Sequence, residues 1–372
     1  MFALVCAGDP TQDEELQMTG RRHGIDAMSK CLGLAVGALA LGCTAASDGS
    51  SSYEGGSYAW GPPAELSASN NNTTGGDPAP GTLTAGVWDD NLNPERFAAF
   101  RDELLQRGST ELPDYTDAER AAALDSAAPQ ARVTLEVALV IDATGSMGDE
   151  LEYLKVELGS IAQSVSETHP NATPRWALVV YRDEGDEYVT RRFDFGDVDP
   201  MVRHLRNQAA DGGGDYPEAA DRALADAATL GWSTDAASAR LLFWVADAPH
   251  HPERTPELEA AVRSLRDQDV RIYPVASSGV DDATEWTMRS AAQLTRGRYL
   301  FLTDDSGVGL THSEPSIPCY FVTTLADAMV RMIEIELSGV YAAPAADSVL
   351  RESGTIVDGV CFDGEAPIAT AY

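Results

Sequence analysis

The chain has 372 residues, with 26 Lys and Arg against 59 Asp and Glu, which gives a formal net charge of −33. Its 44% hydrophobic and 23% charged residues are typical of a globular protein with one large core or two small ones. This balance disfavours nucleic acid as a partner, because phosphate binding needs a clustered basic surface. The same negative field favours cations.

Residues 1–42 are predicted to be a signal segment that is removed. A lysine precedes the apolar run 32–41, which has the length of a secretory signal and is too short to cross a bilayer. Residues 40–43 (Ala-Leu-Gly-Cys) resemble a bacterial lipobox, which implies a lipid on Cys43. We therefore expect a lipid-anchored protein of the cell envelope of a diderm bacterium, at the outer membrane or facing the periplasm, with Met28 as its true start. A plain cleaved secretory signal is the alternative.

Two segments separate this signal from the main domain. Residues 43–90 are rich in Gly, Ser, Asn, Pro and Thr, which predicts a flexible linker between the anchor and the domain. Residues 91–131 are predicted to be a short helical preface. Apolar residues recur at helical spacing over 97–105, and residues 116–119 (Thr-Asp-Ala-Glu) have the form of a capping box.

Strands and helices alternate over residues 132–340, which we assign to one α/β domain. Apolar, β-branched runs predict strands at 135–141, 176–181, 188–195, 240–246, 270–276 and 299–302. Apolar residues at helical spacing predict helices at 151–165, 198–209, 217–230, 256–268, 282–295 and 325–337. This alternation predicts a doubly wound, mostly parallel sheet flanked by helices. The remaining tail, 341–372, is predicted to contain a hairpin around residues 358–359.

Three loops that follow strands carry oxygen donors. Asp142, Thr144 and Ser146 come directly after the first strand, and Asp247 follows the strand at 240–246. Between them, the loop at 211–218 combines three glycines with acidic residues. Ligands of such sheets gather at the carboxyl ends of the strands. Carboxylates and hydroxyls are the ligands of hard divalent cations, so these loops predict a site for Mg²⁺, with Mn²⁺ or Ca²⁺ as alternatives.

Three sequence motifs resemble those of one protein family. They are Val-Ile-Asp-Ala-Thr-Gly-Ser-Met at 140–147, Gly-Gly-Gly-Asp-Tyr-Pro-Glu at 212–218 and Val-Ala-Asp-Ala-Pro-His-His at 245–251. The chain resembles a von Willebrand factor type A domain over about residues 132–338, in its bacterial and alpha-kinase-associated branch. The resemblance implies a six-stranded sheet with one antiparallel edge strand, at 188–195, and a metal-ion-dependent adhesion site.

The resemblance also implies how the metal is held. Thr144 and Ser146 would coordinate it directly or through water, Asp142 would supply charge, and Asp247 would act through water. The open coordination position would accept a carboxylate from a partner protein, and the domain would not be an enzyme.

The second loop departs from the family. Tyr216 stands where the family usually has threonine, and a phenol is a poor ligand for a hard cation. Asp215 is therefore predicted to replace the ligand; a weak site is the alternative. A chain this acidic also repels an acidic ligand. Either the partner presents its carboxylate within a basic surface, or the metal is purely structural.

The rival enzyme interpretation is a phosphatase of the haloacid-dehalogenase type. Asp142 would be its nucleophile, and Asp304 and Asp305 its later metal ligands. Two features oppose it: that family needs a lysine after its second motif, and the only lysine beyond Asp142 is Lys155, in the first predicted helix.

The remaining chemistry-bearing residues have smaller roles. In an exported chain, Cys319 and Cys361 form an even pair, which predicts a disulfide; two buried free thiols are the alternative. His250 and His251 are predicted to form a polar loop over the metal face, since adjacent side chains point apart and make a poor zinc pair. Asp183 is predicted to lie near the metal.

Overall fold

The computed structural model describes residues 82–109, 112–125, 130–214, 216–308 and 311–371. The predicted signal segment, the lipidation at Cys43 and most of the predicted linker lie outside these residues. Within them, no helix has the length and apolar character needed to cross a membrane.

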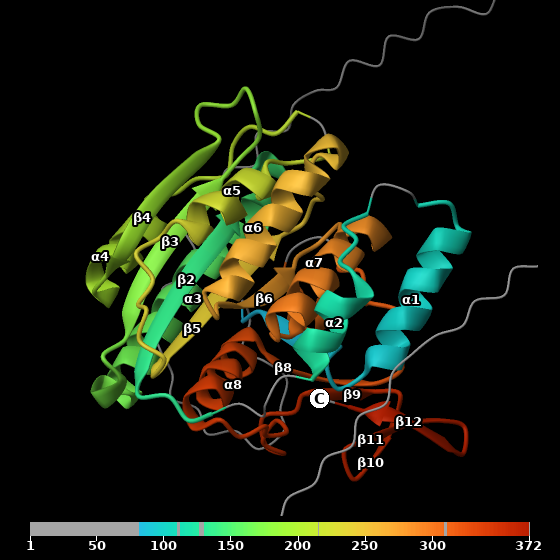
Figure 1. Cartoon of the computed structure of the whole chain (residues 1–372). Coiled ribbons are helices and arrows are strands. Elements are labelled where there is room, and N and C mark those ends of the chain that lie inside the picture. Colours follow the sequence, from blue (N-terminus) through green and yellow to red (C-terminus); the bar gives the residue numbers. More distant parts are fainter. Residues whose placement is uncertain (1–81, 110–111, 126–129, 215, 309–310, 372) are drawn as a thin grey trace, which may run out of the picture. The chain divides into compact units, whose positions relative to one another are not determined.

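The main sheet, as far as the described residues go, has nine strands in the order β4-β3-β2-β5-β6-β7-β1-β8-β9 (Figure 1). Strands β3, β2, β5, β6 and β7 are parallel, and β4 is an antiparallel edge strand paired with β3. The strands are β1 Thr84–Trp88, β2 Thr134–Asp142, β3 Arg175–Tyr181, β4 Thr190–Gly196, β5 Ser238–Ala246, β6 Arg271–Ala276, β7 Tyr299–Leu302, β8 Tyr320–Thr324 and β9 Arg351–Ser353.

Helices cover both faces of this sheet and close a separate core on each (Figure 1). Helices α3, α4 and α8 pack on one face, and α5, α6 and α7 on the other. Along β2, Leu139 and Ile141 enter the first core and Val140 enters the second, as the alternation of side chains along a strand requires. The helices are α1 Pro94–Gln106, α2 Asp117–Leu124, α3 Gly148–Thr168, α4 Val198–Arg206, α5 Ala220–Ala228, α6 Thr255–Asp267, α7 Asp282–Thr295 and α8 Leu325–Ser338.

The predicted fold class, a mostly parallel α/β sheet flanked by helices, is confirmed, and so is the antiparallel edge strand. The expected number of six strands is wrong, because β1, β8 and β9 extend the sheet beyond β7. The assignment of residues 84–88 to a linker is also wrong. They form β1, which is fully buried between β7 and β8 and antiparallel to both.

The helical preface packs onto the domain through Trp286 of α7. The Phe97 ring of α1 stacks on this indole at 4.6 Å between centroids, and Phe100 and Leu104 complete the cluster. The predicted capping box is present: the Thr116 hydroxyl accepts a hydrogen bond from the Glu119 backbone N–H, and the Glu119 carboxylate accepts one from the Thr116 N–H.

The tail combines one strand of the main sheet with a small separate sheet. After β9, strands β10 (Thr355–Val357), β11 (Val360–Asp363) and β12 (Ala366–Thr370) form an antiparallel sheet, which includes the predicted hairpin. The predicted disulfide is present: Cys319 and Cys361 are bonded and buried, with 5.7 Å between their Cα atoms. It joins the small sheet to the segment before β8.

Candidate functional site

Three loops at the carboxyl ends of the parallel strands are joined by backbone hydrogen bonds. The Gly145 N–H donates to the Gly212 carbonyl at 3.1 Å, and the Asp211 N–H donates to the Ala143 carbonyl at 3.1 Å. The Glu218 N–H donates to the Pro249 carbonyl at 2.8 Å. The loops after β2, before α5 and after β5 therefore form one connected surface, as the position of their motifs predicted.

The loop after β2 arranges its polar side chains in a chain of hydrogen bonds. Asp142 Oδ1 accepts from the Thr144 N–H at 2.9 Å and from the Thr144 hydroxyl at 2.7 Å. The Thr144 hydroxyl lies 3.2 Å from that of Ser146. Asp142 and Thr144 are buried, whereas Ser146 is exposed. The second oxygen of Asp142, Oδ2, is buried and accepts no close hydrogen bond from the described residues, and the nearby Tyr181 hydroxyl acts to lower the pKa of Asp142.

The glycine loop can approach this turn because it has no side chains. Gly212 and Gly213 have φ angles of 79° and 69°, in the left-handed region that favours glycine. A Cβ on Gly212 would stand 2.3 Å from Asp186 Oδ2, and one on Gly213 would stand 2.8 Å from Glu218 Oε1. Both carboxylates therefore lie directly against the glycine backbone.

Glu218 is a site residue to which the sequence analysis assigned no role. The predicted helix over 217–230 begins later, at Ala220, and Glu218 instead forms an isolated parallel bridge with His250. Its side chain is 3% exposed, and its Oε2 has no hydrogen-bond partner among the described residues. The sequence feature that could have identified Glu218 as a site residue is its position at the end of a glycine-rich loop.

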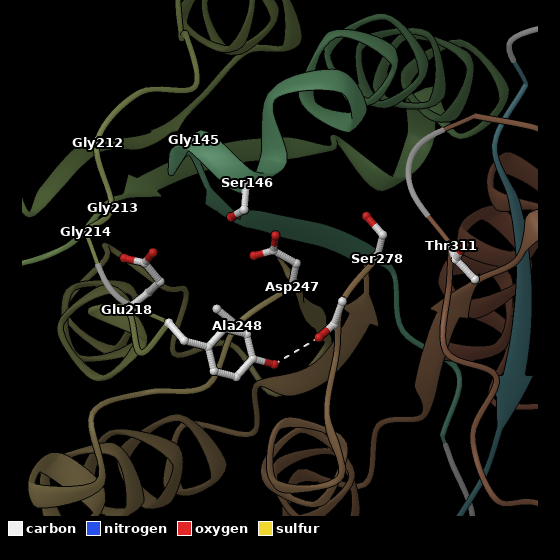
Figure 2. Close-up of a pocket in the computed structure, with 12 residues that line it drawn as sticks. Gly145, Ser146, Gly212, Gly213, Gly214, Glu218, Asp247, Ala248, Ser278 and Thr311 are labelled. Carbon is white, nitrogen blue, oxygen red and sulfur yellow. Dashed lines mark hydrogen bonds between the residues drawn. The ribbon is translucent and has the colours of Figure 1, made fainter. Parts of the chain in front are cut away.

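These loops line a pocket of about 570 Å³. Figure 2 shows Ser146, Asp247 and Glu218 with their oxygens facing the same space. No Lys or Arg is among its lining residues, which are Gly145, Ser146, Gly212, Gly213, Gly214, Tyr216, Glu218, Asp247, Ala248, Ser278, Gly279 and Thr311.

The carboxyl groups of the site are held in a desolvated and negative environment. Burial, followed by the negative charge of Asp247, raises the pKa of Asp142 to about 7. Burial, followed by the charges of Asp142, Asp183 and other nearby carboxylates, raises the pKa of Glu218 to about 9. Because nearby positive charge favours the ionised form of a carboxyl group, a cation in this pocket would lower both pKa values.

The Tyr216 hydroxyl takes a backbone partner in another loop. It donates a hydrogen bond to the Gly279 carbonyl at 2.9 Å, and both residues line the pocket (dashed line in Figure 2). This bond joins the glycine loop to the loop after β6. Asp215, the predicted replacement ligand, lies outside the described residues.

The oxygen donors at the ends of β2 and β5 fit a hard divalent cation. They are two carboxylates, Asp142 of β2 and Asp247 after β5, and the hydroxyls of Thr144 and Ser146. One oxygen of Asp142 is unsatisfied. Among the described residues, no group of three or more His, Cys, Asp or Glu side chains is arranged to hold a metal. A cation here would therefore rely on hydroxyl and water ligands.

The other predicted residues take separate partners. His251 Nε2 lies 2.6 Å from Asp183 Oδ1, whereas His250 Nε2 lies 2.8 Å from the Thr255 hydroxyl, so the adjacent rings point to different groups. Burial lowers the pKa of His250 to about 4. Asp186 Oδ2 accepts hydrogen bonds from the Asp183 N–H at 3.1 Å and from the Gly213 N–H at 2.9 Å, which places Asp183 beside the glycine loop.

The two aspartates of the phosphatase interpretation are both bonded to cationic or imidazole groups. Asp304 Oδ1 lies 2.9 Å from His312 Nδ1, and Asp305 accepts a hydrogen bond from Arg351 Nε at 2.9 Å.

Comparison with known proteins gives a family match and more distant similarities. Residues 136–312 match the sequence model of the von Willebrand factor A domain. A putative ariadne-like RING finger protein of Acanthamoeba polyphaga mimivirus is 31% identical over 190 residues, which cover 46% of this chain and 18% of that protein. The chain thus spans less than a fifth of that relative. Two crystal structures of the pilus adhesin SpaC from Lactobacillus rhamnosus GG match 46% of this chain and 28% of theirs, with 11% identity and TM-scores of 0.35 and 0.36.

Proposed function

We propose, from the premise that residues 136–312 are a von Willebrand factor A domain, that the domain binds a divalent cation and, through it, an acidic group of a protein partner. Mg²⁺ is the favoured ion, with Mn²⁺ and Ca²⁺ as alternatives. The role would be adhesion or complex assembly, and no catalytic residue is assigned.

The observation that carries this proposal is the unsatisfied oxygen of Asp142. A buried carboxylate oxygen without a hydrogen bond is costly, and a bound cation is one way to offset that cost. Asp142 Oδ2 is such an oxygen, and two hydroxyls stand on the same turn. Few chemical species other than a hard cation suit this combination of donors.

Each residue of the site would have a separate role in binding the ion. Asp142 orients the Thr144 hydroxyl through the 2.7 Å hydrogen bond and contributes negative charge. Ser146, exposed at the pocket surface, would hold the ion on the solvent side. When bound, the ion supplies an electrophilic position that a partner carboxylate can occupy. The Tyr216–Gly279 hydrogen bond joins two loops that line the pocket.

The location of this binding domain belongs to the same proposal. The lipobox-like residues 40–43 support a lipid anchor on Cys43, and the Gly- and Asn-rich segment that follows supports a tether. The protein would then present its domain in the cell envelope of a diderm bacterium, at the outer membrane or facing the periplasm.

A paramagnetic probe tests the proposed function on the full chain. Mn²⁺ bound at the site should strongly accelerate the relaxation of the acetate methyl protons, because acetate would occupy the open coordination position. Asp142→Asn should abolish the protein-dependent part of this effect. Asp117→Ala, which removes a charge from a fully exposed position on α2, serves as the matched control.

Two results would count against the proposal. Equal acetate relaxation in wild type and Asp142→Asn would place the Mn²⁺ elsewhere. Mn²⁺ binding without any effect on acetate would leave a structural ion with no open position.

A further inference from the structure

Glu218 is the pocket carboxylate that the metal-binding proposal does not use. It lines the pocket, is 3% exposed, and its Oε2 has no hydrogen-bond partner among the described residues. A buried carboxylate costs several kcal/mol unless a positive or hydrogen-bonding group satisfies it. No Lys or Arg is among the described residues that line this pocket, and none of its hydroxyl or N–H groups donates to Glu218 Oε2.

The position of Glu218 is fixed and separate from the β2 turn. Its backbone is held by the 2.8 Å hydrogen bond to Pro249 and by the bridge to His250. Its carboxylate lies against Gly213 of the glycine loop. In Figure 2, Asp247 stands below Ser146, and Glu218 stands below the label of Gly214, at another place along the same pocket.

The strongest electrostatic influences on Glu218 come from carboxylates of one sign, namely Asp142, Asp183, Asp186 and Asp247. A divalent ion at the β2 turn would be balanced by the charges of Asp142 and Asp247. A partner carboxylate on that ion would add further negative charge and favour the protonated form of Glu218, whereas a basic group beside Glu218 would favour its ionised form.

The pocket also has more room than a metal-bound carboxylate uses. Its volume is about 570 Å³, and it extends from Ser146 and Asp247 to the glycine loop and Glu218. The Tyr216 ring forms part of the lining, and its hydroxyl is tied to Gly279. A planar cation that entered this space would meet a carboxylate and an aromatic ring, a pair that suits a guanidinium group.

We propose that Glu218 is a second anchor of the pocket and binds a basic group of the same partner whose carboxylate binds the metal. This inference rests on the proposed function. The partner would present an acidic and a basic group together, with a guanidinium preferred over an ammonium because it can form two parallel hydrogen bonds to a carboxylate. Such a ligand also removes the conflict between an acidic target and a chain of net charge −33.

The test compares two series of small probes on the full chain in saturating Mg²⁺. One series is guanidinoacetate, 3-guanidinopropionate and 4-guanidinobutyrate, and the other is the alkanoates of matching chain length. At least one guanidino acid should bind about tenfold more tightly than its alkanoate, since a charge-assisted hydrogen bond to Glu218 is added. Calorimetry or ligand-observed NMR gives the affinities.

Variants assign the preference to Glu218. In Glu218→Gln the ratio of affinities should fall to about one, while the alkanoates bind at least as well as they bind the wild type. Glu257→Gln, at an exposed position of α6, is the matched control and should keep the wild-type ratio. Circular dichroism checks that Glu218→Gln is folded, and Mg²⁺ titration checks separately whether its metal site is intact.

The possible failures are distinguishable. Equal affinity of both series for the wild type overturns the second anchor and leaves the metal-dependent function standing. Loss of Mg²⁺ binding in Glu218→Gln makes Glu218 a metal ligand and also overturns it. If the wild type binds neither Mg²⁺ nor any probe, the proposed function itself is wrong.

Discussion

Two groups of buried carboxylates among the described residues differ in their partners, because one is paired with arginines and the other is not. Between β1 and α7, Asp90 receives hydrogen bonds from Arg289 at 2.7 and 3.1 Å, and Asp89 receives one from Arg298 at 2.8 Å. All four side chains are almost fully buried. At the pocket, Asp142 and Glu218 are equally buried, yet no arginine or lysine lines the space.

The difference separates structural charge from binding charge. Both regions bear the cost of removing carboxylates from water. The Asp89–Asp90 cluster recovers that cost within the folded chain and fastens β1 to the sheet. The pocket leaves the cost to be offset by whatever binds there. In this protein, a buried acidic residue therefore indicates a binding site only where no Arg or Lys of the chain is paired with it.

The largest effect should come from removing a cation from the paired cluster. Arg289→Ala leaves Asp90 and Glu285 buried without their guanidinium, so it should lower the free energy of unfolding by about 3–5 kcal/mol. Guanidinium chloride unfolding of the full chain measures this. A loss below about 1 kcal/mol would show that the pairing contributes no more than a surface ion pair. The contrast between the paired cluster and the pocket would then be wrong.

Glu157 of α3 provides an intermediate case, since it is partly buried and forms no ion pair with a basic side chain among the described residues. Its Oε2 accepts a hydrogen bond from the Leu83 N–H at 3.1 Å. Burial raises its pKa to about 7, against 4.5 in the unfolded chain. The folded state thus keeps a proton that the unfolded state loses, so this group lowers stability as pH rises from about 4.5 to about 7.

Glu157→Gln should remove that pH dependence. The variant should gain about 3 kcal/mol relative to the wild type at pH 8 and show no gain at pH 4. Urea unfolding at both pH values gives the difference. A gain of equal size at both values would mean that packing, and not ionisation, causes it.

The smallest effect is expected at an exposed ion pair. Arg107 bonds Asp282 between α1 and α7, and both side chains are 55% exposed. Arg107→Ala should change the free energy of unfolding by less than about 1 kcal/mol, because water screens the pair. The same unfolding assay applies, and a cost near that of Arg289→Ala would show that burial does not govern these charges.

The sequence predicted the parts of the fold that have local signatures. The apolar runs of β2, β5 and β6 and the helices on both faces lie where periodicity indicated. Strand β1 was missed because its five residues follow a Gly- and Asn-rich tract, and only pairing with β7 and β8, more than 200 positions along the chain, identifies it.

Within the site, motif residues were predictable and their setting was not. Asp142, Thr144, Ser146 and Asp247 stand in the loops where their motifs predicted them. The role of Glu218 was hidden, since an acidic residue near a helix start is common and only the bridge to His250 turns it toward the pocket. Likewise, the Tyr216 hydroxyl finds its partner 63 residues away, at Gly279.

The central claim is that the carboxylates of the pocket bind a cation that comes from outside the chain. Calorimetric titration of the full chain with Mg²⁺, wild type against Asp142→Asn, tests it most directly. Asparagine keeps the oxygen that accepts the Thr144 hydrogen bonds, so the turn should persist while the charge is lost. The account predicts saturable binding in the wild type and none at this site in the variant. Identical titrations of the two proteins would contradict it.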